Sequence, residues 1–276
     1  MGEPKVVVLT GASAGIGAAA ARSLSAAGHE VVVVGRSPER TRAIADEIGA
    51  RHFLVDLEEA LSVRDLAARL LAELPRIDVL ALNAGALYGE RRRTVDGHER
   101  TWQVNVLSPA LLSRMLLPRL RESEGRVVLT SSAVHRFARL EVNDLEGRHS
   151  SYSMLGAYGS AKLAGLLLLD EAAKRAQAPL VGMAAFHPGY VASHVFRDVP
   201  VLHGLVNAAF SRRLTLSPEE GSVPLQYLAT VPTNAELHQT YWHRMQERRI
   251  RHPQWHDVQL RAALREAVVS FDTAIV

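Results

Sequence analysis

The chain has 276 residues, of which 47% are hydrophobic and 22% charged, and it contains no cysteine. This composition is typical of a soluble globular protein, and the lack of cysteine excludes a disulfide framework, a thiolate nucleophile and Cys-based metal sites. The net charge of +3 is too small to indicate a nucleic-acid partner, so the arginine-rich runs at 91–93 and 248–251 are interpreted as solvated surface.

Buried strands and helices alternate along the chain. Apolar, β-branched runs predict strands at residues 5–9, 30–34, 52–55, 79–82, 126–129 and 180–186. Ala- and Leu-rich segments predict helices at residues 16–27, 38–48, 61–74, 101–121 and 158–176. The strands are apolar on both faces, as in a parallel sheet covered by two layers of helices. We therefore expect an α/β fold of Rossmann type, with a doubly wound parallel sheet of about seven strands and helices on both faces.

Several local signals support a single domain over residues 1–276. Ser37 followed by Pro38 is a helix start, while Gly28 and Gly49 follow helical segments as stops. No repeat or Pro/Gly/Ser-rich linker divides the chain, and the irregular stretches 133–155 and 192–216 are predicted substrate loops. The N-terminus lacks signal-peptide features, and the longest apolar helical run, 163–169, is far shorter than a bilayer span. We expect a cytoplasmic protein without a transmembrane segment.

A glycine-rich turn follows the first strand, where residues 10–17 read TGASAGIG and open the first helix. At this position glycines allow a pyrophosphate to approach the free N–H groups of a helix N-terminus. The turn therefore predicts a dinucleotide cradle, although a lone glycine-rich match can be a mere tight turn.

Arg36 ends the second strand, where proteins of this fold that use NAD carry an acid for the ribose hydroxyls. A guanidinium can bind a 2′-phosphate instead, and no nearby carboxylate is expected to repel it. The cofactor is therefore predicted to be NADP(H) rather than NAD(H), with Arg40 assisting, unless Arg36 is only a surface arginine.

Tyr158 and Lys162 lie four residues apart, and hence on one face of a helix. A phenol titrates near pH 10, and a neighbouring cation favours the phenolate. We expect Lys162 to lower the pKa of Tyr158 and so prepare it for proton transfer. Alone, this spacing also occurs by chance on exposed helices.

Four further motifs follow one another along the chain: Asn83-Ala84-Gly85, Asn105, Ser131-Ser132 and His187-Pro188-Gly189. With the glycine turn and the Tyr158–Lys162 pair, they make the chain resemble the short-chain dehydrogenase/reductase (SDR) family from about residue 4 to residue 230. Within the family it looks most like the retinol-dehydrogenase-like branch, judged by residues 143–146, 157–163 and 217–221.

The resemblance implies a role for each motif residue. Tyr158 would be the general acid in reduction and the base in oxidation, and Ser132, rather than Ser131, would hydrogen-bond the reacting oxygen. Lys162 would hold the nicotinamide ribose, and Asn105 would order water beside it. The cofactor-binding residues would be Gly11, Ser13, Gly15, Ile16, Gly17, Arg36, Asp56, Leu57, Asn83, Ala84, Gly85, Tyr158, Lys162, Pro188, Gly189, Val191 and Ser193.

Simpler roles stay open for three of these residues. Asn105 could cap or kink a helix, Ser132 could close a turn, and Asp56 could be a helix N-cap. Ser193 stands where the family more often has threonine, which keeps the hydroxyl.

The predicted substrate is a carbonyl or alcohol compound with apolar parts, because the two loops and the residues next to them carry Phe137, Leu140, Tyr190, Phe196 and Leu202. His135, His187 and His194 have no convincing metal-ligand spacing, so no metal is predicted. Residues 163–169 are apolar around the whole helix, which suggests pairing between subunits in a homodimer or homotetramer.

Two other functions remain as alternatives. The first is a catalytically silent NADP(H)-binding regulator or scaffold, which the intact Ser132, Tyr158 and Lys162 disfavour. The second is a nucleotide-sugar epimerase or dehydratase, whose members usually have longer chains.

Overall fold

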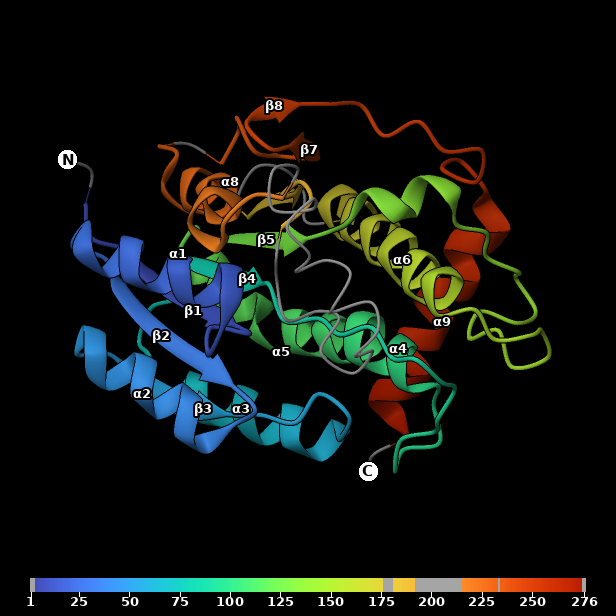
Figure 1. The fold of residues 1–276 in the computed structure, drawn as a ribbon, viewed down its shortest axis with the longest axis horizontal. Helices are drawn as coiled ribbons and strands as arrows, with labels where there is room; N and C mark the ends of the chain where they lie inside the picture. Colours follow the sequence, from blue (N-terminus) through green and yellow to red (C-terminus); the bar gives the residue numbers. More distant parts are fainter. Residues whose placement is uncertain (1–2, 176–180, 192–214, 233, 275–276) are drawn as a thin grey trace.

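The computed structural model describes residues 3–175, 181–191, 215–232 and 234–274. Its centre is a sheet with the strand order β3-β2-β1-β4-β5-β6-β7-β8 (Figure 1). The strands from β1 to β7 pair in parallel, and β8 pairs antiparallel to β7. The predicted Rossmann-type doubly wound sheet is confirmed.

The strand bounds agree closely with the six predicted runs. The strands are β1 (Val6–Thr10), β2 (Glu30–Gly35), β3 (Arg51–Leu54), β4 (Val79–Leu82), β5 (Arg126–Thr130), β6 (Gly182–His187), β7 (Thr240–His243) and β8 (Gln246–Glu247). The last two were not located from the sequence, because they are short and carry polar residues on both faces.

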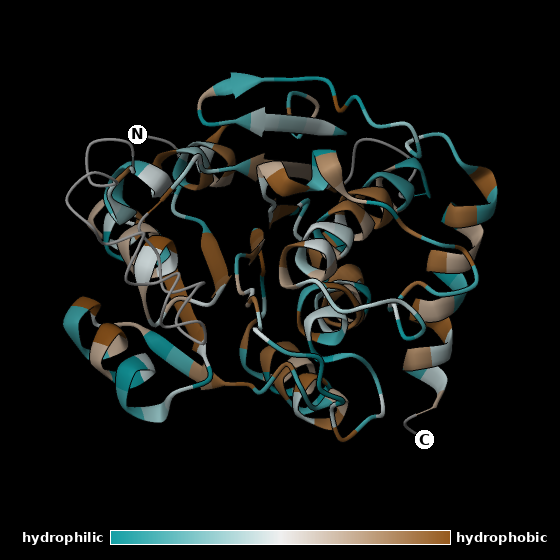
Figure 2. Cartoon of the chain, turned by 45° about the vertical axis from the view of Figure 1, so that its right-hand side comes forward, coloured by the Kyte–Doolittle hydropathy of each residue, from teal (hydrophilic) through white to brown (hydrophobic). Residues whose placement is uncertain are grey.

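Helices cover both faces of the sheet. On one face lie α1 (Gly15–Ala26), α2 (Pro38–Ile48) and α8 (Pro218–Thr230), and on the other lie α3 (Ala60–Glu73), α5 (Ser108–Glu122) and α6 (Met154–Arg175). A further helix, α9 (Val258–Thr273), packs outside α5 and α6. Figure 2 shows the apolar strands enclosed between helices whose outer surfaces are more hydrophilic.

Alternate residues of each strand face the two helical layers. Val8 and Leu80 pack in the core beside α3, α5 and α6, whereas Val7 and Leu9 pack in the core beside α1 and α8. Val7, Val8 and Leu9 are fully buried, which explains why the first strand is apolar without alternation.

The predicted start and stop of α2 are confirmed. The Ser37 side chain accepts a hydrogen bond from the backbone N–H of Arg40, Pro38 occupies the first turn, and Gly49 ends the helix in the left-handed conformation at φ 64°. α2 therefore begins two residues after Arg36, close to the carboxyl end of β2.

The predicted helix over residues 101–121 is confirmed, but it contains a π-helical turn that the sequence did not indicate. The chain forms α4 (Arg100–Trp102), a π-helical turn η1 (Gln103–Leu107) and only then α5. The Asn105 side chain donates to the carbonyl of Thr101 at 2.9 Å, and Pro109 has no N–H to give to the carbonyl of Asn105. Ordinary α-helical pairing is therefore weakened on both sides of Asn105.

The apolar segment of α6 is buried within the chain itself. Leu163, Leu166 and Leu167 belong to the main core, and α9 lies against the outer side of α6. Burial of these leucines thus needs no second subunit, and the predicted oligomer stays a prediction. Among the described residues, none of the helices has the length and apolar character that crossing a bilayer requires.

Candidate active site

A cavity of about 560 Å³ opens at the carboxyl ends of the central strands. Ligands of doubly wound sheets bind at this edge, where the strand order reverses between β1 and β4. The predicted residues that line it are Gly11, Ser13, Gly15, Ile16, Gly17, Arg36, Asp56, Leu57, Asn83, Ala84, Gly85, Ser132, Tyr158, Lys162, Pro188, Gly189 and Val191. Ser193 lies outside the described residues.

The glycine turn is built so that side chains would not fit. A Cβ on Gly17 would lie 2.2 Å from the carbonyl oxygen of Gly11, and a Cβ on Gly11 would lie 2.8 Å from the Cα of Ala84. Gly11 and Gly15 also have positive φ angles of 67° and 53°. The turn therefore has room for backbone alone, and its free N–H groups lie at the N-terminus of α1.

Asn83 connects three strand ends. Its side-chain nitrogen donates to the carbonyl of Thr10 at 3.1 Å, and its side-chain oxygen accepts from the Thr130 hydroxyl at 3.2 Å. The Thr10 hydroxyl accepts from the backbone N–H groups of Asn83 and Ala84, both at 3.1 Å. These bonds hold the ends of β1, β4 and β5 in register under the cavity.

Ser132, Tyr158 and Lys162 come together at the other end of the cavity. Ser132 follows β5 and precedes the short helix η2 (Ala133–Phe137), and the other two project from α6. Neither the Ser132 hydroxyl nor the Tyr158 hydroxyl has a hydrogen bond to another described residue. Both remain available to a bound molecule.

Lys162 is buried, and its Nζ donates to the carbonyl of Thr130 at 3.2 Å. The same atom lies 5.2 Å from the centre of the Tyr158 ring. Burial lowers the pKa of Lys162 to about 8. Since this value is above 7, the ammonium remains mostly charged at neutral pH.

The expected lowering of the Tyr158 pKa was wrong for this structure. Burial raises the pKa of Tyr158 above its ordinary value. Desolvation prevails because Lys162 directs its ammonium to the Thr130 carbonyl rather than to the phenol oxygen.

Asn105 does not line this cavity, in contrast to the other three predicted catalytic residues. It borders a second, mostly apolar cavity of about 420 Å³ between α5, α6 and α9. Its nitrogen donates to the carbonyls of Ala86 and Thr101, while its buried Oδ1 has no partner among the described residues. A Cβ on Gly85 would lie 2.8 Å from that oxygen and 3.1 Å from the Nζ of Lys162. The acceptor and the ammonium thus both lie beside Gly85, so Asn105 belongs to the surroundings of Lys162.

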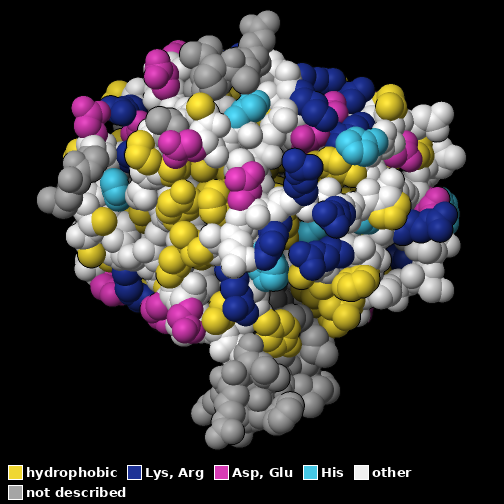
Figure 3. All heavy atoms as spheres, turned by 90° about the horizontal axis from the view of Figure 1, so that it is seen from above, with side chains coloured by type: hydrophobic (Ala, Val, Ile, Leu, Met, Phe, Trp, Pro, Cys, Tyr) yellow, Lys and Arg dark blue, Asp and Glu magenta, His cyan; other side chains and the backbone are white. Residues whose placement is uncertain are grey.

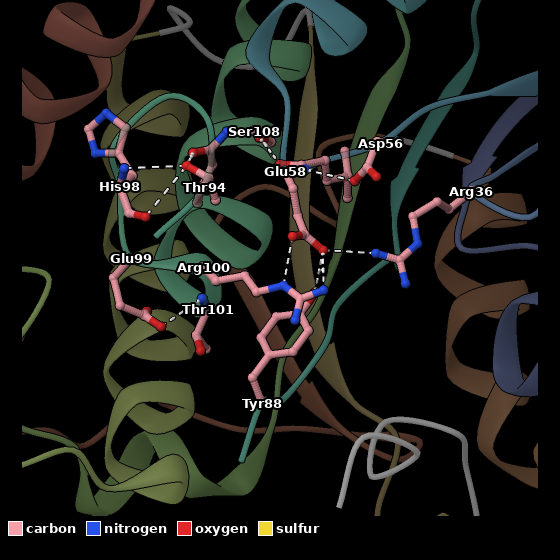
Figure 4. Close-up of polar contacts among 12 residues, drawn as sticks. Arg36, Asp56, Glu58, Tyr88, Thr94, His98, Glu99, Arg100, Thr101 and Ser108 are labelled. Carbon is pink, nitrogen blue, oxygen red and sulfur yellow. Dashed lines mark hydrogen bonds and ion pairs between the residues drawn. The ribbon is translucent and has the colours of Figure 1, made fainter. Parts of the chain in front are cut away.

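Arg36 also differs from its prediction, because a carboxylate does lie beside it. Its Nη1 donates to Oε1 of Glu58 at 2.8 Å (Figure 4). Glu58 in turn accepts two hydrogen bonds from Arg100, each of 2.7 Å. The pair was invisible in the sequence because Glu58 lies 22 residues from Arg36.

Asp56 has a local structural role as well as a place in the cavity wall. Its carboxylate accepts the backbone N–H of Glu58 at 3.0 Å, and its own N–H donates to the Ser62 hydroxyl at 3.0 Å. It therefore stabilises the turn before α3, whose N-cap is Glu59. The predicted N-cap role is wrong, while a cofactor contact stays a prediction.

The substrate end contains residues that the sequence did not indicate. His243 and Arg244 line the cavity, and the His243 ring centre lies 5.1 Å from that of His187. Burial lowers the pKa of His187 to about 4, assisted by the charges around it, so its ring is neutral at pH 7. No motif marks β7, which brings His243 there. Figure 3 shows Lys and Arg side chains gathered on one side of the molecule seen from above, with hydrophobic side chains beside them.

The apolar lining differs from the loop residues predicted for it. Tyr190 and Leu155 line the cavity, but Phe137 is 90% exposed and Leu140 is buried in the main core. Phe196, Leu202 and His194 lie outside the described residues.

Comparison with known proteins identifies the family. The model of the short chain dehydrogenase family matches residues 5–200. The chain is 39% identical over 236 residues to DnrU of Streptomyces sp. (strain C5), provisionally named a daunorubicin C-13 ketoreductase, covering 83% of this chain and 79% of DnrU. It is 40% identical over 202 residues to retinol dehydrogenase 12 of Mus musculus, covering 70% of this chain and 64% of that protein.

Among solved structures, a protein from Mycobacterium paratuberculosis superposes with a TM-score of 0.75 at 28% identity, covering 97% of this chain and 92% of the other. The glycine turn, the parallel sheet and the sequence matches agree. The chain therefore belongs to the short-chain dehydrogenase family of oxidoreductases and, within it, is similar to the retinol dehydrogenases.

Proposed function

We propose that this protein is an NADP(H)-dependent oxidoreductase that transfers a hydride between nicotinamide and a carbonyl or alcohol carbon, with Tyr158 as the general acid or base. The observation that carries the proposal is that Ser132, Tyr158 and Lys162 line the same cavity as the glycine turn and Arg36. One cavity thus combines a phosphate cradle, a proton-transfer group and a cation.

The residues present fit such a cofactor. The positive-φ glycines and the close approach of Gly17 to Gly11 leave backbone N–H groups for a pyrophosphate. Arg36 and Arg40 line the end of the cavity where an adenosine 2′-phosphate would lie, and Asn83, Ala84 and Gly85 line the path between. Lys162 would hold ribose hydroxyls, and the unpartnered Oδ1 of Asn105, close to Gly85, would order water beside Lys162.

The chain's own groups supply the proton chemistry. A nicotinamide held in the cavity would supply or accept the hydride. As negative charge grows on the carbonyl oxygen, the Ser132 hydroxyl donates a hydrogen bond to it and Tyr158 transfers its proton. The Lys162 ammonium offsets the phenolate that remains. In the oxidation direction the phenolate accepts the alcohol proton.

The substrate class is inferred from the lining and from the relatives. Leu155, Val134 and Tyr190 give the substrate end apolar surface, while Ser132 and Tyr158 supply hydroxyls. The relatives include proteins named a ketoreductase and retinol dehydrogenases. A bulky, largely apolar ketone, aldehyde or alcohol fits both. All these groups belong to one sheet and its helices, so residues 1–276 would act as one catalytic domain.

The test is to incubate the purified protein with NADPH and a panel of apolar ketones, aldehydes and quinones, and to follow the loss of reduced-nicotinamide absorbance. Turnover that Tyr158→Phe and Ser132→Ala each reduce by on the order of a hundredfold or more would support the proposal. NADPH binding without turnover across the panel would favour a silent regulator. Turnover that Tyr158→Phe leaves intact would contradict the proposed role of the phenol.

A further inference from the structure

The acid beside Arg36 is itself part of a larger cluster. Oε1 of Glu58 accepts from Arg36 at 2.8 Å, from Arg100 at 2.7 Å and from the Tyr88 hydroxyl at 3.2 Å. Oε2 accepts from the Nε of Arg100 at 2.7 Å. Figure 4 shows Glu58 between the two guanidinium groups. One carboxylate therefore binds two arginines.

Only part of this cluster reaches the cavity. Arg36 and Tyr88 line it, whereas Glu58 and Arg100 do not. The Arg36 side chain is 42% exposed, compared with 20% for Glu58 and 24% for Arg100. A ligand in the cavity would contact Arg36 directly. Glu58 and Arg100 would act on the ligand only through their effect on Arg36.

The position of Arg100 is held from several sides. Its guanidinium lies over the Tyr88 ring, 3.9 Å from the ring centre. It begins α4, where the Glu99 carboxylate caps the helix by accepting the N–H groups of Thr101 and Trp102. These contacts hold the Arg100 guanidinium in the position from which it donates two hydrogen bonds to Glu58.

The charges of Glu58 and Arg100 determine how strongly Arg36 can attract a phosphate. A pair of Arg36 and Glu58 alone would be formally neutral and would hold little attraction for an incoming phosphate. Burial alone would raise the pKa of Glu58, but the hydrogen bonds and charge of Arg100, together with the charge of Arg36, bring it below its ordinary value. The carboxylate is therefore ionised at neutral pH, and Arg100 returns the cluster to a formal charge of +1.

We infer that Arg100 is a specificity-determining positioning residue: by neutralising Glu58 from outside the cavity, it leaves the charge of Arg36 free for the 2′-phosphate of NADP(H). The inference rests on the proposed function, because it concerns the same cofactor. It predicts that preference for the 2′-phosphate depends on a side chain that does not touch the cofactor.

The experiment measures binding of adenosine 2′,5′-bisphosphate and of 5′-AMP by calorimetry, since the ratio of their dissociation constants isolates the 2′-phosphate. Arg100→Met should lower this preference roughly tenfold without weakening 5′-AMP, through loss of one nearby charge. Glu58→Gln should preserve or increase the preference. Arg100→Met combined with Glu58→Gln should restore it to within about threefold of the wild type, because the net charge is again +1.

Two further variants serve as controls. Arg22→Met removes the arginine of another bidentate Arg–Glu pair, with Glu47, away from the cavity, and should leave the ratio unchanged. Arg100→Lys retains the charge and should keep most of the preference. If Arg100→Met does not fold, Glu58→Gln and Arg100→Lys decide: a preference that falls in Glu58→Gln overturns the inference.

The outcomes separate this inference from the proposed function. A wild-type ratio near one would overturn the NADP(H) proposal and this inference together. Wild-type preference that Arg100→Met leaves unchanged, or equal weakening of both nucleotides, would overturn the inference alone. A double variant as poor as Arg100→Met would also count against it, because charge balance would then not be the cause.

Discussion

Lys162 lies beside Tyr158 but does not hydrogen-bond its hydroxyl: the Nζ is 5.2 Å from the ring centre and donates to the Thr130 carbonyl at 3.2 Å. Lys162 is buried and Tyr158 is half-buried in the cavity wall, and the loss of hydration shifts their pKa values toward the neutral forms, upward for Tyr158 and downward to about 8 for Lys162. At neutral pH this arrangement has a protonated phenol next to a charged ammonium. The proposed mechanism requires this state for the reduction of a carbonyl.

The rate of reduction should therefore be nearly constant below about pH 8 and fall above it, as Lys162 loses its charge. Oxidation needs the phenolate, so its rate should rise with pH over the same range. The kcat profiles of both directions, measured at saturating cofactor, test this. Lys162→Arg keeps its charge at high pH and should move the fall in reduction upward. A reduction rate that increases through pH 8 would contradict the assignment.

Lys162→Met should make the protein more stable while removing most of its activity. Because the folded-state pKa of Lys162 is lowered, burying its charge costs free energy below about pH 8, and stability should rise as pH increases from there toward the ordinary value of 10.5. We expect the free energy of unfolding at pH 7 to increase by about 1–3 kcal/mol in the variant. Urea unfolding at two pH values measures both effects. A less stable variant would mean that the bond to Thr130 outweighs the desolvation.

Gly17→Ala should abolish dinucleotide binding, since its Cβ would lie 2.2 Å from the Gly11 carbonyl oxygen. The turn would have to move, and its N–H groups with it. Gly28→Ala is the matched control: Gly28 has a φ of 88° but nothing within 4 Å of an added Cβ. That variant should lose about 1 kcal/mol of stability and bind nucleotides normally. Fluorescence titration with NADPH and thermal melts distinguish the two, and normal binding by Gly17→Ala would contradict the cradle.

Arg261→Met should loosen α9 from α6. The buried Arg261 pairs with Asp170 and Glu171, both at 2.8 Å, and donates to the Trp255 carbonyl. Its loss leaves two carboxylates without a shared cation, for which we expect a cost of roughly 3–5 kcal/mol.

Arg265→Met is the control for this pair of helices. Arg265 contacts Glu171 at 2.9 Å but is 31% exposed, so its loss should cost less than about 1 kcal/mol. Equilibrium unfolding in urea measures both variants. Equal effects would mean that the pairing of Arg261 adds nothing beyond surface charge.

Much of the fold was predictable because its signals are local. A fully buried strand such as residues 79–82 must be apolar on both faces, and a helix start such as Ser37-Pro38 needs only neighbours in sequence. The glycines of the turn and the spacing of Tyr158 and Lys162 belong to the same class. Local signals did not indicate the π-helical turn inside the helix of residues 101–121, where the side chain of Asn105 bonds the backbone of Ala86 as well as that of its own helix.

The order of residues was enough to predict the parallel sheet, and it was enough to propose a phosphate-binding turn and a catalytic set, because each requires particular side chains within a few positions of one another. The order of residues did not predict which charged and buried groups surround those residues. Glu58 reaches Arg36 and Arg100 across 22 and 42 positions, and β7 brings His243 to His187. Charge and burial act through space, so folding alone determined that an acid lies beside Arg36 and that the surroundings of Tyr158 raise its pKa.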